Sequence, residues 1–181
     1  MAAERKSNTT PGASGFEFVI AREFDAPRDL MFKLWTEREH LMHWWGPKGC
    51  EIVSCKNDLR VGGVMHYAMR WTEGMVMWGR WIYREIVKPA KLVFLNSFSD
   101  EHEGLTVHPM APDWPRETLS TITFEERAGK TLVTVKWQPW DATEKEKKTF
   151  ADRRDSMHEG WTGTLDRLEV YLPGAVKSGA R

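Results

Sequence analysis

Two histidines, His40 and His43, stand three residues apart in a segment that predicts a helix, so their imidazoles would share one helix face. Such a pair could bind a metal ion together with a third ligand. Neither an HExxH motif nor a Cys/His partner follows, so the set of ligands is incomplete. We expect no metal and no cofactor, and we interpret both histidines as surface residues or as contacts between helices.

Other side chains could supply acid–base chemistry if they faced a cavity. His102 and His108 lie in a long segment (residues 99–116), where either could act as a base over a cavity mouth, although loop histidines are often merely solvated. Glu85 and Arg22 share strand faces with large apolar residues, and we interpret them as an inward ion pair at the end of a sheet. The chain has no GxSxG motif, Gly-rich phosphate loop or dinucleotide fingerprint. The motifs therefore identify no catalytic residue, and an enzymatic activity stays uncertain.

The two cysteines, Cys50 and Cys55, are an odd number of residues apart in a predicted strand, which would place them on opposite faces. We therefore expect two unpaired thiols, which suit a reducing compartment. The first residues, MAAERKSNTTPGASG, lack the apolar core of a secretory signal. These features predict a cytoplasmic protein.

The composition excludes two broad classes of partner. Because 26 basic residues balance 26 acidic ones, the positive surface of a nucleic-acid-binding protein is not expected. No apolar run approaches the roughly 20 residues of a membrane-spanning helix.

A chain of 181 residues can bury one core. This chain is unusually rich in Trp (10) and Met (9), whose side chains can either fill a core or line a cavity.

The hydrophobic periodicity predicts one strand, two helices, six strands and a long helix. The first strand covers residues 16–24, Asp25 caps a helix with Pro27 in its first turn, and a second helix covers residues 37–44. The six strands are expected at residues 50–56, 63–71, 77–87, 91–98, 117–126 and 130–138. Short connections between them imply antiparallel neighbours. The exception is the segment 99–116, which holds three prolines and has the length of a functional lid.

The last helix is predicted to begin at Thr143 and to run to Leu172, with one apolar stripe along its length. The only large apolar surface that this stripe could cover is the inner face of the sheet. We therefore expect a single domain over residues 16–172 between two flexible tails, residues 1–15 and 173–181.

Four segments carry a family resemblance: AREFDAPRDLMFKLWTEREHLMHWWGPKG (21–49), DLRVGG (58–63), YREIVKPAKLVF (83–94) and MHEGWTGTLDRLEVYL (157–172). They resemble the START-like (SRPBCC) superfamily, and most closely the bacterial single-domain relatives of the activator of the heat-shock-protein-90 ATPase. The resemblance implies an α+β helix-grip fold, in which a curved antiparallel sheet of about seven strands wraps around a long C-terminal helix. Eukaryotic chaperone activators of this kind carry an additional N-terminal domain that contacts the chaperone, and we expect none here.

Strand alternation names the side chains that would face the interior, unless a one-residue bulge inverts the faces. The residues expected to contact a ligand are Trp45, Met65, Tyr67, Met69, Trp71, Trp81, Tyr83, Phe94, Asn96, Phe98, Trp137, Met157 and Trp161. Asn96 is the polar residue most out of place among them, and it could either orient a ligand or satisfy nearby backbone groups. His66 is expected on the solvated outer face. Gly160 and Gly163 either permit close backbone approach of the long helix or leave space beside it.

Three functions follow from this interpretation. The first is the binding of a small apolar molecule in an internal cavity between the sheet and the long helix. The others, implied by the resemblance, are a cyclase- or hydrolase-type enzyme using the same cavity and a chaperone-ATPase-activator-like interaction module. The partners expected are a small apolar molecule, a second copy of the chain in a homodimer and, less directly, a chaperone; nucleic acid and membranes are not expected.

Overall fold

The computed structural model describes residues 8–9 and 15–179. In chain order the elements are β1 (Asn8–Thr9), β2 (Phe18–Phe24), α1 (Arg28–Thr36), α2 (Arg38–Trp44), β3 (Cys50–Asn57), β4 (Val64–Trp71), β5 (Val76–Val87), β6 (Lys91–Ser99), β7 (Glu117–Arg127), β8 (Lys130–Trp140), α3 (Glu144–Asp152) and α4 (Arg154–Gly179). From β2 onward the predicted order is confirmed, and the last helix is divided in two.

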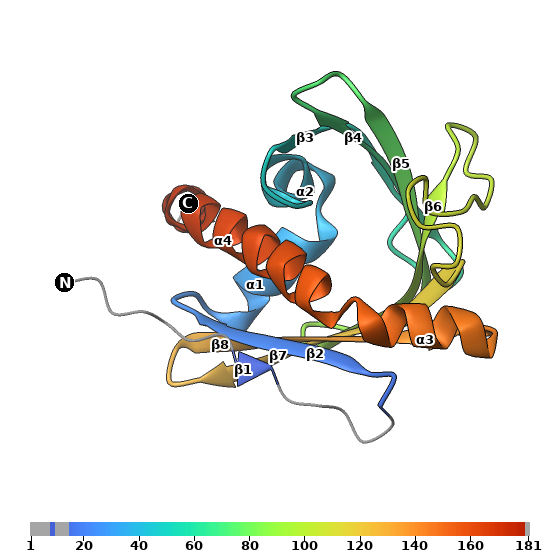
Figure 1. The fold of residues 1–181 in the computed structure, drawn as a ribbon. Coiled ribbons are helices and arrows are strands. Elements are labelled where there is room, and N and C mark those ends of the chain that lie inside the picture. Colours follow the sequence, from blue (N-terminus) through green and yellow to red (C-terminus); the bar gives the residue numbers. More distant parts are fainter. Residues whose placement is uncertain (1–7, 10–14, 180–181) are drawn as a thin grey trace.

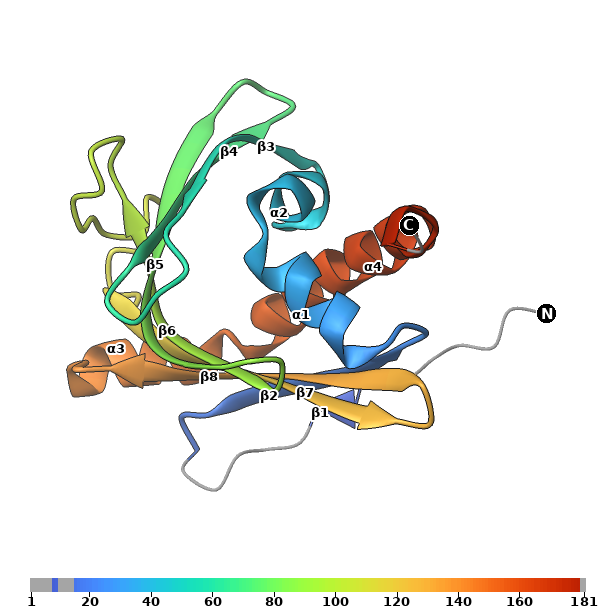
Figure 2. The ribbon, with the colours of Figure 1, turned by 180° about the vertical axis from the view of Figure 1, so that it is seen from behind.

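All strands belong to one antiparallel sheet with the order β1-β2-β8-β7-β6-β5-β4-β3. The first long strand, β2, lies beside the last, β8, with Ile20 opposite Val135. Figures 1 and 2 show that the sheet curves around α1, α2 and α4, while α3 lies at one end. Side chains that alternate toward the concave side form the core, and burying each large one contributes about 1.5–3 kcal/mol.

The C-terminal helix begins where predicted but differs from the prediction in its middle and at its end. Thr143 caps α3 through a capping box with Glu146, but the helix stops at Arg153, where φ is −102° and ψ is 19°. Phe150 is buried on α3, and its ring centroid is 5.3 Å from that of Trp114 in the segment between β6 and β7, so α3 packs at the end of the sheet. α4 then turns across the concave side (Figure 1).

The predicted C-terminal tail is wrong for residues 173–179, because α4 continues to Gly179 in spite of Pro173. Ala175 is 3% exposed, and its packing holds the last turns in place of the hydrogen bond that a proline cannot donate. Residues 180–181 lie outside the described part of the chain. Of the predicted N-terminal tail, residues 1–7 and 10–14 are not described, while Asn8 and Thr9 form β1 on the edge of β2.

Two β-bulges invert predicted faces. In β3 the register shifts between Ile52 and Ser54, so Cys55 returns to the inner side, and the prediction of opposite faces for the two cysteines is wrong. Both thiols are buried and free, and burial raises the pKa of Cys55 to about 11. In β5 a shift between Tyr83 and Glu85 turns Glu85 outward, where it pairs with Lys91 at 2.7 Å. Glu85 is therefore not an inward acid.

Two smaller predictions are also corrected. Asp25 does not cap α1, because the N-cap position is Pro27 and no side chain there accepts a hydrogen bond. His66 is not solvated but 3% exposed, since its Nε2 lies 3.0 Å from the Asp100 carbonyl oxygen and its ring stacks on Trp78 at 4.8 Å. Over residues 8–9 and 15–179, no helix combines the length and apolarity needed to cross a membrane.

Candidate ligand-binding site

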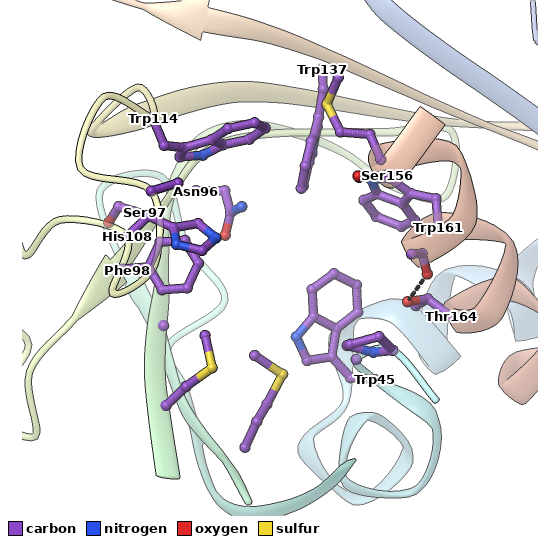
Figure 3. A pocket seen from close by; sticks show the side chains of 18 of the residues that line it. Trp45, Asn96, Ser97, Phe98, His108, Trp114, Trp137, Ser156, Trp161 and Thr164 are labelled. Carbon is purple, nitrogen blue, oxygen red and sulfur yellow. Dashed lines mark hydrogen bonds between the residues drawn. The ribbon is translucent and has the colours of Figure 1, made fainter. Parts of the chain in front are cut away.

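A cavity of about 320 Å³ lies between the sheet, the segment after α2, the β6–β7 segment and the first turns of α4. In Figure 3, Asn96, Phe98, His108 and Trp114 stand on one side, and Ser156, Trp161 and Thr164 of α4 on the other. The predicted residues that line it are Trp45, Tyr67, Met69, Trp71, Asn96, Phe98, Trp137, Met157 and Trp161.

The other four predicted residues, Met65, Trp81, Tyr83 and Phe94, are buried but do not line this cavity. Trp81 stacks on Phe94 with ring centroids 4.1 Å apart, and the Tyr83 hydroxyl donates a hydrogen bond to Asn57 Oδ1 at 2.9 Å. They belong to the part of the concave face that other side chains fill. Sequence alternation identified their side of the sheet correctly but not where along the strands the cavity lies.

Trp45 forms the wall opposite Trp137 (Figure 3). Its ring lies 5.7 Å from Trp161 and 6.0 Å from Tyr67, in edge-to-face contacts. The backbone that carries it is held by Arg167 of α4, whose Nη1 donates to the carbonyl oxygens of Trp45, Gly46 and Pro47 at 3.0–3.1 Å. A charged donor thus satisfies carbonyl groups at the end of α2 and fixes the WWGPKG segment (residues 44–49) against α4.

Tyr67 reaches the cavity across the neighbouring strand. It pairs with Gly79, where a Cβ atom would lie 2.5 Å from both Cζ and the hydroxyl oxygen of Tyr67, so only glycine admits the ring. Burial raises the pKa of Tyr67 to about 12. The phenol is therefore neutral at physiological pH.

The two glycines at the middle of α4 have different surroundings. A Cβ on Gly163 would lie 3.4 Å from Lys48 Cγ and 3.6 Å from the Lys48 backbone nitrogen, which is ordinary van der Waals contact, so the packing of this segment on α4 does not require glycine here. A Cβ on Gly160 would meet nothing within 4 Å, and Gly160 lines the cavity. The interpretation that a glycine leaves space therefore fits Gly160, whereas the contacts at Gly163 do not support the interpretation of close backbone approach.

Asn96 lines the cavity, yet its Oδ1 is buried without a hydrogen-bond partner among the described residues. An unsatisfied buried acceptor costs about 1–3 kcal/mol. The sequence left two roles open for Asn96, orienting a ligand or satisfying nearby backbone groups. In this arrangement Oδ1 accepts no hydrogen bond from a described backbone group.

The sequence did not single out several lining residues: Pro47, Met77, Trp78, Gly79, Ala111, Trp114, Arg153, Ser156 and Thr164. For Ala111 and Trp114 the one signal was the length of the β6–β7 segment, which the structure places against the cavity. Of its two histidines, His108 lines the cavity and His102 is exposed. Nδ1 of His108 accepts the Met110 backbone N–H at 3.0 Å, and burial together with Arg153 lowers the pKa of His108 below its usual value.

The remaining polar candidates have structural partners. His40 Nδ1 lies 2.8 Å from the Tyr171 hydroxyl and His43 stacks on the same ring at 5.2 Å, so the pair contacts α4. Arg22 faces inward as predicted, but it pairs with Asp166 of α4 at 2.8 Å and not with Glu85. Within residues 8–9 and 15–179, no three His, Cys, Asp or Glu residues are grouped so that they could hold a metal ion.

A model of the family described as Activator of Hsp90 ATPase homolog 1-like protein matches residues 25–173. Protein Ms6760 from Mycobacterium smegmatis is similar in structure, with a TM-score of 0.75, 23% identity and coverage of 92% of this chain and 96% of that one. A protein from Arthrobacter aurescens has a TM-score of 0.76 and 23% identity, with 92% of this chain and 91% of that one covered. The AHSA1 protein from Silicibacter pomeroyi has a TM-score of 0.67 and 18% identity, with 87% of this chain and 97% of that one covered. No curated protein matches significantly in sequence. At these identities the likeness shows the fold, and it confirms the predicted helix-grip architecture.

Proposed function

The chain belongs to the family of Activator of Hsp90 ATPase homolog 1-like proteins, and from that premise we propose that it binds a small apolar molecule in the cavity between its sheet and α4. The volume of about 320 Å³ is at the small end of the range for ligand pockets, roughly 300–1,000 Å³. Aromatic rings and Met side chains supply most of the wall, which suits an apolar molecule.

The observation that carries this proposal is Gly160. Glycine inside a helix costs about 1 kcal/mol relative to alanine, and here no neighbouring atom requires it. Gly160 lines the cavity, so the space left free at its Cβ belongs to the cavity. Bulk added at Gly160 should therefore occupy the ligand's place without displacing the backbone.

The test is a fluorescence titration with N-phenyl-1-naphthylamine, a neutral apolar probe. Gly160→Leu should weaken its binding at least about tenfold, because the new side chain fills part of the cavity. Gly174→Leu is the matched control: it lies on the same helix, has open space at its Cβ, and is exposed away from the cavity. Circular dichroism verifies that both variants fold. A wild-type protein that binds no probe, or a Gly160→Leu variant that binds as well as the control, would overturn the proposal.

The other functions named from the sequence stay predictions. Turnover of a candidate substrate would identify a cyclase- or hydrolase-type enzyme. Capture of a purified bacterial homologue of the 90-kDa chaperone would identify an interaction module. A cytoplasmic location and a homodimer likewise stay predictions.

A further inference from the structure

We propose that the ligand is an organic anion, with an apolar body among the Trp and Met side chains and a carboxylate or sulfonate group held by Arg153 and His108. This inference rests on the proposed function and adds the charge of the ligand to it. It concerns the end of the cavity where the β6–β7 segment meets the junction of α3 and α4.

The charge of the lining is the first observation. Among the described residues that line the cavity, Arg153 is the only one with a formal charge, and none is an Asp or Glu. In a chain of which 29% is charged, an apolar cavity with one cation at its rim favours a ligand of opposite sign.

The second observation is that Arg153 forms no ion pair within residues 8–9 and 15–179. The carboxylate of the preceding residue, Asp152, pairs with Lys148 at 2.6 Å, and Asp113 of the β6–β7 segment pairs with Lys145 at 2.9 Å. A guanidinium presents a planar fork of donors that matches a carboxylate or sulfonate. Arg153 is thus a charged donor at the cavity that pairs with no carboxylate of the described part of the chain.

The third observation is the orientation of His108. Because its Nδ1 accepts the Met110 N–H, the proton of the neutral ring is on Nε2, which is then a donor. The ring is held by Phe98, with centroids 4.6 Å apart, and by Trp114 at 6.1 Å. Arg153 is close enough to lower the pKa of this imidazole, so the two donors belong to one site.

The Ser156 hydroxyl, on the first turn of α4, lines the same cavity and can add a further donor. Arg153 is also reached by water, which screens its charge. We therefore expect the anionic group to increase affinity about tenfold, as one hydrogen bond to a charged group does, and not by several orders of magnitude.

The test compares two probes that share one skeleton. N-phenyl-1-naphthylamine is neutral, and 8-anilinonaphthalene-1-sulfonate carries a sulfonate on the same ring system. The wild-type protein should bind the sulfonate more tightly at low salt, and added KCl should reduce that preference. Arg153→Gln should weaken the sulfonate about tenfold and change the neutral probe by less than about twofold.

Arg154→Gln is the matched control, because it removes the same charge one residue away. The Arg154 side chain donates to the Gly15 carbonyl oxygen at 2.6 Å and does not line the cavity, so both affinities should be unchanged. Neutral-probe binding with a sulfonate affinity that Arg153→Gln does not alter would overturn the anion inference and leave the proposed function standing. If neither probe binds, or Gly160→Leu weakens neither, the proposed function falls and this inference with it.

Discussion

Replacing Gly160 with alanine should stabilise the protein by about 1 kcal/mol, the helix-propensity difference between the two residues. The full difference is expected because the new methyl group would meet no atom within 4 Å and no positive φ is present at this position. For a chain of this length, a gain of this size raises the midpoint of thermal unfolding by about 2–4 °C. Thermal and urea unfolding followed by circular dichroism measure it.

Two other glycines of α4 calibrate the result. Gly174→Ala, also open at its Cβ, should give a similar gain without touching the cavity. Gly163→Ala should also stabilise the protein, because its methyl group would make ordinary van der Waals contacts with Lys48, 3.4 Å from Cγ and 3.6 Å from the backbone nitrogen. If Gly160→Ala destabilises the protein while Gly174→Ala stabilises it, α4 has no free space at Gly160 and the reasoning about the cavity is refuted.

Three further predictions concern the frame of the cavity. Gly79→Ala should destabilise the protein by about 1–3 kcal/mol in urea unfolding, because its methyl group would overlap the Tyr67 ring. In a protein that already carries Tyr67→Ala, the same substitution at Gly79 should change the free energy of unfolding very little. Arg167→Met should lower the free energy of unfolding by about 1.5–3 kcal/mol, because the charged hydrogen bonds to three carbonyl groups are lost, and should shift the near-ultraviolet circular dichroism of Trp45. An unchanged spectrum and stability would contradict the inference that Arg167 positions Trp45. Burial raises the pKa of Tyr67 to about 12 and also raises that of Tyr83, so their contribution to stability is complete below pH 10 and is lost as the pH rises above it. Tyr67→Phe should reduce the loss of unfolding free energy between pH 10 and 12, measured by urea unfolding at each pH. An unchanged pH dependence would contradict the inference that burial raises the pKa of Tyr67.

The elements could be predicted from the sequence because periodicity and turn residues are local signals. The boundaries of β3 to β8 lie within two residues of expectation, and the last helical region begins at Thr143 as predicted. The bulges in β3 and β5 leave no such signal, and each inverts the faces beyond it, which misplaced Cys55 and Glu85.

The site was predicted less completely because a cavity is what remains after side chains from distant elements have packed. Trp81 and Phe94 alternate inward like Tyr67 and Met69, yet they stack on each other and fill the space between them. Arg153 sits at a helix break without a Gly or Pro to announce it. The position of Arg153 depends on how α3 and α4 pack at their junction, which the spacing of residues in the sequence does not predict.

The bulge in β3 also bears on how copies of this protein could meet. β3 is one edge of the sheet over the described residues, and an edge strand offers unpaired backbone groups to any other strand. A bulge at Ile52 to Ser54, with exposed Glu51 and Lys56 on either side, makes this edge irregular and charged. Two copies aligned through β3 would have to straighten the bulge and desolvate those charges. The edge therefore resists the strand-by-strand aggregation to which open sheets are prone.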